Sequence, residues 1–120
     1  MDGILGVEEI TFFVQDVGEA KEWYIRLLGS KPVFEHPDFC SFQLGETSIG
    51  LHPADGKTPS GIAGQVAYWR VENLEKTIEK FVSHDCEIFR GPIVGVDDVK
   101  ICQIRDPFGN AWGLIEKENG

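Results

Sequence analysis

The sequence contains few of the residues from which several kinds of site are built. Its 120 residues include only three cysteines and three histidines. Cys40, Cys86 and Cys102 stand far apart and are odd in number, which favours free buried thiols over a disulfide framework or a paired-cysteine metal site. No arrangement of these residues in the sequence indicates a nucleophile beside a general base, although such partners meet in space rather than in sequence.

Long apolar runs and an excess of basic residues are also lacking. No stretch is long enough to span a bilayer, and the first nine residues lack the basic and apolar segments of a secretory signal. The formal net charge is −9, with 11 Lys and Arg against 20 Asp and Glu, which argues against nucleic acid or an anionic membrane surface as a partner. We therefore expect a cytoplasmic protein with no nucleic-acid partner and no membrane partner.

What the sequence does contain is a pattern that occurs twice. A strand ends and a helix begins at residues 14–16 (Val-Gln-Asp), and the same change occurs 57 residues later at 71–73 (Val-Glu-Asn). Short segments of β type follow each helix. We therefore predict an α+β fold of two β-α-β-β-β modules, at about residues 1–56 and 62–120, in a single domain whose sheets curl around a shared cavity.

The two predicted helices begin at cap residues. Asp16 stands three residues before Glu19, a capping-box spacing, and Gly29 suits the left-handed residue that ends a helix. Asn73 caps the second helix in the same way. Residues 91–98, rich in Gly, Pro and Val, are predicted to form a surface loop. Apolar residues at helical spacing predict the buried stripe of the second helix: Leu74, Ile78, Phe81 and Val82.

The predicted hairpin after the first helix has one apolar face and one mainly polar face. Strands over residues 39–44 and 47–52 flank a two-residue turn, and the resulting register pairs Ser41 with Gly50. The apolar face suits packing under a helix. The other face is mainly polar, and this fits two interpretations equally well, a ligand-binding surface and a face exposed only to solvent. That face carries Phe39, Ser41, Gln43, Ser48, Gly50 and His52.

Several motifs together resemble those of a known family. Residues 106–110 (Asp-Pro-Phe-Gly-Asn) predict a turn before the last apolar strand. Three further motifs accompany this turn: residues 14–16, the Trp-Tyr pair at 23–24 and the Leu-Gly pair at 28–29. Together these motifs resemble those of the glyoxalase / bleomycin-resistance / extradiol-dioxygenase (vicinal oxygen chelate) superfamily, over essentially the whole length of the chain. The resemblance implies two modules whose sheets form a half-open curved sheet, commonly completed by a second subunit, and we expect a homodimer.

The resemblance also implies a divalent metal held at four strand positions. Here those positions are Glu9, Gly50, Val66 and Gly113, and only Glu9 is a plausible oxygen ligand. Because catalytic metal sites usually need three protein donors, we expect no metal cofactor. A displaced divalent metal site formed by Glu9 and His52 is the alternative, since His52 stands two residues beyond Gly50 and so on the same strand face.

We therefore expect a member of this superfamily that binds a small organic molecule without a metal. The alternative is an enzyme, a glyoxalase-like lyase or isomerase or a dioxygenase, with a rearranged metal site or a metal-free one in which Glu9 is the general base and Arg70 stabilises an oxyanion. We predict that Arg70 pairs with Glu9 and that it moves to the ligand if the ligand is anionic or bears a carbonyl group. The candidate ligand-binding residues, assigned by strand alternation, are Glu9, Thr11, Phe13, Ser41, Gln43, Ser48, His52, Tyr68 and Arg70.

Overall fold

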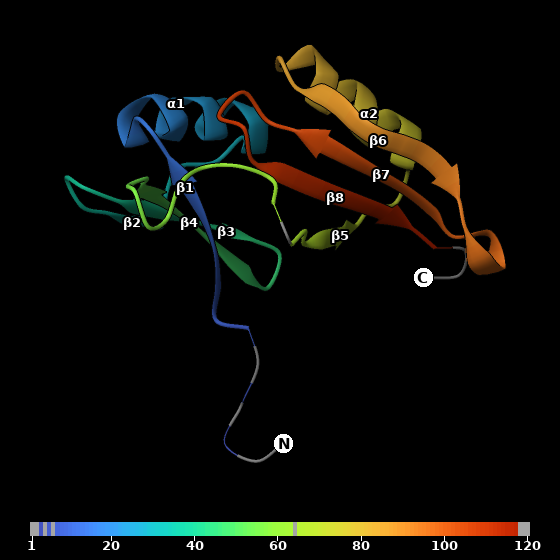
Figure 1. The fold of residues 1–120 in the computed structure, drawn as a ribbon, viewed down its shortest axis with the longest axis horizontal. Helices are drawn as coiled ribbons and strands as arrows, with labels where there is room; N and C mark the ends of the chain where they lie inside the picture. Colours follow the sequence, from blue (N-terminus) through green and yellow to red (C-terminus); the bar gives the residue numbers. More distant parts are fainter. Residues whose placement is uncertain (1–2, 4, 6, 64, 118–120) are drawn as a thin grey trace. The chain divides into compact units, whose positions relative to one another are not determined.

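The structure, a computed structural model, describes residues 3, 5, 7–63 and 65–117. The chain divides into two compact units, Met1–Ser60 (unit 1) and Gly61–Gly120 (unit 2). In the part described, each unit contains an α-helix and a four-stranded sheet in the order β-α-β-β-β (Figure 1). Neither α-helix is long and apolar enough to cross a membrane, as far as the described residues extend. The predicted α+β fold of two such modules is confirmed.

Unit 1 has a mixed sheet with one parallel pair of strands. Its elements are β1 (Glu9–Val14), α1 (Val17–Leu28), β2 (Phe34–Glu35), β3 (Cys40–Leu44) and β4 (Thr47–Pro53). The strand order is β1-β4-β3-β2, with β1 parallel to β4 and the other pairs antiparallel. The register of β3 and β4 pairs Ser41 with Gly50, as the two-residue turn predicts.

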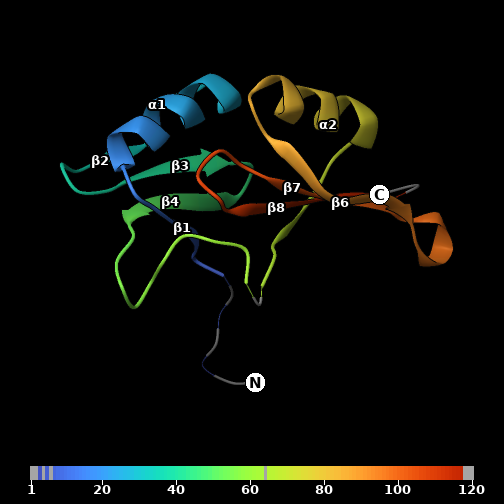
Figure 2. The same ribbon diagram turned by 45° about the horizontal axis from the view of Figure 1, so that its top comes forward.

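Helix α1 covers one face of this sheet (Figure 2). The Asp16 side chain accepts a hydrogen bond from the backbone N–H of Glu19 at 3.0 Å, and Gly29 ends the helix at a φ of 72°. Both features agree with the sequence prediction. Alternate strand residues pack beneath the helix and leave the opposite sheet face uncovered by α1. The buried side chains of this core include Val14, Ala20, Trp23, Tyr24, Leu27, Phe42, Ile49 and Leu51.

Unit 2 repeats the plan with a longer edge strand. Its elements are β5 (Tyr68–Arg70), α2 (Leu74–Ser83), β6 (Glu87–Val94), the 3₁₀ helix η1 (Val96–Asp98), β7 (Lys100–Arg105) and β8 (Ala111–Glu116). The strand order is β5-β8-β7-β6, and β5 is parallel to β8. Helix α2 covers one face of this sheet (Figure 2), with Trp112, Leu114 and Ile104 buried beneath it.

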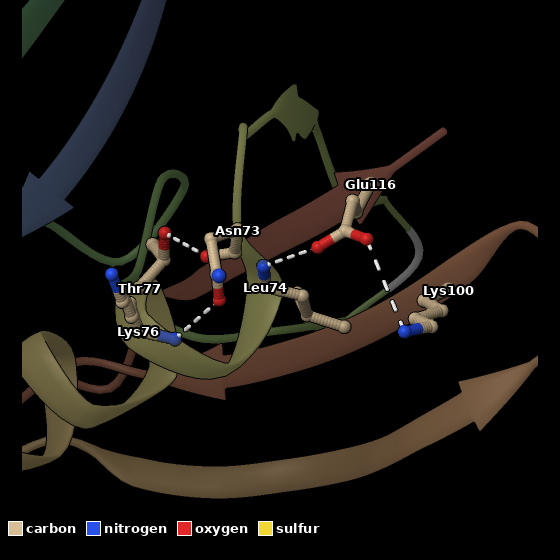
Figure 3. A network of polar contacts seen from close by, with 6 residues as sticks. All are labelled: Asn73, Leu74, Lys76, Thr77, Lys100 and Glu116. Carbon is tan, nitrogen blue, oxygen red and sulfur yellow. Dashed lines mark hydrogen bonds and ion pairs between the residues drawn. The ribbon is translucent and has the colours of Figure 1, made fainter. Parts of the chain in front are cut away.

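Helix α2 begins at two side-chain caps (Figure 3). The Asn73 side chain accepts a hydrogen bond from the backbone N–H of Lys76 at 2.9 Å, as predicted. A second acceptor comes from strand β8, because the Glu116 carboxylate accepts from the backbone N–H of Leu74 at 2.7 Å. The ammonium group of Lys100 lies 4.0 Å from the other Glu116 oxygen. These contacts fix the start of α2 against the end of the sheet.

Two sequence predictions for unit 2 are wrong. Val82, predicted to be buried, is 45% exposed, because it lies about 100° round the helix from Phe81 and so at the flank of the buried stripe. Residues 91–98, predicted to be a surface loop, belong mostly to β6 and η1. An edge strand with irregular pairing accommodates both Gly91 and Pro92, which a regular central strand does not.

The three cysteines are buried and form no disulfide, so the prediction of free buried thiols is confirmed. Cys40 lies in unit 1, and Cys86 and Cys102 lie in unit 2. Burial, together with the nearby carboxylates of Asp106 and Asp85, raises the pKa of the Cys86 thiol to about 12. The thiols are therefore inert core residues.

Candidate functional site

The face of the unit 1 sheet that α1 leaves uncovered (the open face) carries seven of the nine candidate residues. Strand pairing places them side by side, because residues directly paired on neighbouring strands project from the same face. All but Gln43 are half-buried, and Gln43 is exposed. The seven are Glu9, Thr11 and Phe13 from β1, Ser41 and Gln43 from β3, and Ser48 and His52 from β4.

Glu9 makes two polar contacts on the open face. The hydroxyl of Thr11 donates a hydrogen bond to Glu9 Oε2 at 2.6 Å. The Nε2 atom of His52 lies 3.5 Å from the same oxygen. The side chains of His52 and Glu9 are 33% and 30% exposed, so the carboxylate is oriented by its neighbours but is still accessible to a ligand.

The carboxylate of Glu9 lies over Gly50, which β4 places beside Thr11. A Cβ atom at residue 50 would overlap Glu9 Oε2 and would lie 2.6 Å from the carboxyl carbon. Real Cβ atoms do not approach other atoms so closely. Glycine at this position therefore provides the space that the Glu9 carboxylate occupies.

The residues at the four metal positions implied by the superfamily resemblance do not fit a metal centre. Glu9 has an oxygen donor, whereas Gly50 and Gly113 have no side chain and Val66 is apolar. Moreover, the Glu9 carboxylate fills the space into which a ligand side chain at residue 50 would project. Over residues 7–63 and 65–117, no three His, Cys, Asp or Glu side chains gather where they could hold a metal ion. An open catalytic metal site needs more protein donors than these positions supply.

Aromatic rings stack on the open face, in a row that begins at His52. The rings of His52 and Phe39 are parallel within 6°, with centroids 5.0 Å apart. His36 stacks on Phe39 at 4.6 Å and 18°. We call His36, Phe39 and His52 the aromatic column. Phe34 and Phe13 flank it, at 5.7 Å from Phe39 and 6.3 Å from His52.

The sequence prediction misses part of this column. Phe39 is predicted to lie on the polar face but is not among the candidate ligand-binding residues, and neither Phe34 nor His36 is predicted to lie near the site. Phe34 lies in β2 and His36 directly follows it. Strand β2 is two residues long and pairs with β3 without a recognisable turn motif. No local sequence signal identifies so short a strand.

The remaining candidates, Tyr68 and Arg70, lie in β5 of unit 2. The ring of Tyr68 lies over Gly113, where a Cβ atom would lie 2.8 Å from Tyr68 Cδ1. The Tyr68 hydroxyl accepts a hydrogen bond from the side chain of Gln103 at 2.7 Å. Arg70 is exposed and has the same strand parity as Tyr68. The pairing of Arg70 with Glu9 joins the two units and stays a prediction.

Comparison with known proteins identifies the family. The sequence model of the Glyoxalase/Bleomycin resistance protein/Dioxygenase superfamily matches residues 6–114, and the chain belongs to this superfamily. The search of curated proteins found no match.

Solved structures with the same fold cover nearly the whole chain. A superfamily member from Sphaerobacter thermophilus DSM 20745 has a TM-score of 0.77 at 22% identity, with 95% of this chain and 98% of that chain covered. A glyoxalase-related enzyme from Fulvimarina pelagi has a TM-score of 0.76 at 15% identity, with coverage of 96% and 90%. Lactoylglutathione lyase from Agrobacterium tumefaciens has a TM-score of 0.72 at 19% identity, with coverage of 96% and 96%. At these identities the likeness shows the fold alone.

Proposed function

We propose that the protein binds a small organic molecule on the open face of unit 1, without the metal implied by the superfamily resemblance. The observation that carries this proposal is the position of Glu9. Its carboxylate is held by Thr11 and His52 over Gly50 and is partly exposed, and Glu9 and His52 together are fewer donors than a catalytic metal requires. Around it, Ser41 and Ser48 offer hydroxyl groups to a ligand.

Ligand screening on the protein as purified tests this proposal. We expect a compound library, screened by thermal shift, to contain molecules whose binding persists after dialysis against EDTA. Glu9→Gln should weaken that binding, whereas Glu8→Gln, an exposed neighbour, should not. The proposal is contradicted if binding requires added metal, or if no substitution on the open face changes the binding affinity.

A second candidate function is catalysis on the same face. The contacts of Glu9 with Thr11 and His52 favour it, because an oriented and accessible carboxylate is suited to act as a general base. Since one structural relative is a lactoylglutathione lyase, that activity is the first to assay. Turnover by the wild-type protein that disappears in Glu9→Gln supports an enzyme, and no turnover with wild-type protein favours a binding protein.

We also propose that the protein is a cytoplasmic homodimer. The edge strand β6 supports association, because its apolar side chains Ile88, Phe89, Ile93 and Val94 are 39% to 63% exposed. Free buried thiols suit a reducing compartment. Sedimentation analysis should give a dimer that Val94→Lys weakens. A monomer at every concentration contradicts the dimer.

A further inference from the structure

We propose that the ligand of the open face is a planar aromatic compound whose positive charge lies close to its ring, such as an arylalkylammonium ion. This inference rests on the proposed function, since it names the chemical class of the molecule bound there. It combines two features of unit 1, the charge of the open face and the aromatic column.

The charge of the open face favours a cation. Glu9 contributes a carboxylate to the open face, and strands β1 to β4 contain no Lys or Arg. Lys21 of α1 pairs with Glu35 at 3.2 Å, and Glu35 shares its face with the buried Cys40 and not with Glu9. Within unit 1, therefore, no lysine or arginine of the sheet neutralises Glu9. The acidic chain, with a net charge of −9, attracts the same kind of ligand from a distance.

The aromatic column favours a flat ligand. Ring faces carry negative electrostatic potential and attract cations, and parallel rings form a platform on which a further planar ring stacks. His52, the member of the column beside Glu9, has a side chain that is 33% exposed, so this end of the platform is accessible to a ligand that also reaches Glu9. Phe34 and His36 are exposed, whereas Phe13, Phe39 and His52 are half-buried, and exposed apolar patches often mark ligand-binding sites.

His52 connects the two features. Its Nε2 atom lies 3.5 Å from the Glu9 carboxylate, and its ring stacks on Phe39. A ligand that stacks on the rings and reaches Glu9 therefore needs its charged group within a few bonds of its ring. An anionic ligand would bring like charge against Glu9 with no lysine or arginine of the sheet to offset it, which costs affinity.

Three compounds that share the indole ring and differ in the charge of the substituent at C3 test the inference. Tryptamine is a cation at neutral pH, 3-methylindole is uncharged, and indole-3-acetate is an anion. We expect chemical-shift titration of the full chain to give a dissociation constant for tryptamine about tenfold lower than that for indole-3-acetate, with 3-methylindole between them. The shifted resonances should lie on the open face of unit 1. Equal or tighter binding of indole-3-acetate, or no binding of tryptamine, overturns the inference.

Variants separate the two features. Glu9→Gln should remove the preference for tryptamine over 3-methylindole, and Phe39→Leu should weaken both compounds about equally. Glu46→Gln, in the exposed turn between β3 and β4, is the control that should change nothing. Circular dichroism checks that each variant is folded. An unchanged tryptamine preference in folded Glu9→Gln overturns the inference. If library compounds of another class bind this face without metal, the ligand class is wrong and the proposed function survives.

Discussion

In unit 1 the carboxylate of Glu9 occupies the space that any side chain at residue 50 would need, and the two residues fit together only because residue 50 is glycine. The parallel pairing of β1 with β4 creates this relationship by placing Thr11 beside Gly50, so that Glu9, two residues earlier on the same face, leans over it. The strand glycine is therefore part of the candidate site and not a defect of the sheet.

Replacing Gly50 by alanine should displace the Glu9 carboxylate and break its hydrogen bond with Thr11. Because the overlapping atoms belong to the end of a flexible side chain, we expect the fold to survive with a loss of about 1 kcal/mol in the free energy of unfolding. In a Glu9→Ala background the same substitution should cost less. Urea unfolding of the four proteins of this double-mutant cycle measures the coupling. Strictly additive effects contradict the contact.

Gly113 provides a matched comparison in unit 2. A Cβ atom there would lie 2.8 Å from the backbone carbonyl oxygen of Ala67 as well as 2.8 Å from the Tyr68 ring. Since backbone cannot move aside as a glutamate side chain can, Gly113→Ala should cost about 2–3 kcal/mol, more than Gly50→Ala. An equal or smaller cost at Gly113 contradicts this reasoning.

The carboxylate of Glu116 should stabilise unit 2 through the start of α2. Glu116→Ala leaves the backbone N–H of Leu74 without its acceptor, and we expect the free energy of unfolding to fall by about 1–2 kcal/mol. Glu116→Gln keeps an acceptor oxygen and should cost less. Lys100→Met tests the ion pair alone, which is long and half-exposed and should contribute little. Urea unfolding distinguishes the three variants, and equal losses in the Ala and Gln variants rule out the cap.

The buried thiols should make the protein sensitive to alkaline pH. Burial raises the pKa of Cys86 to about 12 and also raises the pKa values of Cys40 and Cys102 above the ordinary value of 9.0. The unfolded chain therefore releases these protons at lower pH than the folded chain, so folding stability should fall as pH rises from about 9 to 12. Unfolding measured across this range checks the trend. At neutral pH, iodoacetamide should label the native protein far more slowly than the denatured protein, and equal rates would show that the thiols are exposed.

Features that depend on a few neighbouring residues are predictable from this sequence. The caps at Asp16 and Asn73 and the helix end at Gly29 follow from side-chain chemistry within one helical turn. The Ser41–Gly50 register follows from a two-residue turn. Strand β6 was not predictable, because its edge position and irregular pairing with β7 make a Gly-Pro segment acceptable in a strand.

The candidate site, too, was predictable from the sequence only in part. Strand alternation predicts which residues of β1, β3 and β4 share the open face, since a strand has a period of two. It does not predict the parallel register that brings Gly50 beside Thr11, because this pairing joins segments far apart in the chain. Nor does it predict His36, whose stacking on Phe39 depends on the two-residue strand β2.

The measurement that tests the central claim most directly is the metal content of the protein purified without added metal, together with ligand binding before and after chelation. The account predicts far less than one Zn, Ni, Mn or Fe per chain, and ligand binding that EDTA leaves unchanged, because residues 50, 66 and 113 supply no side-chain donor beside Glu9. About one such ion per chain, lost on Glu9→Ala together with ligand binding, would contradict it.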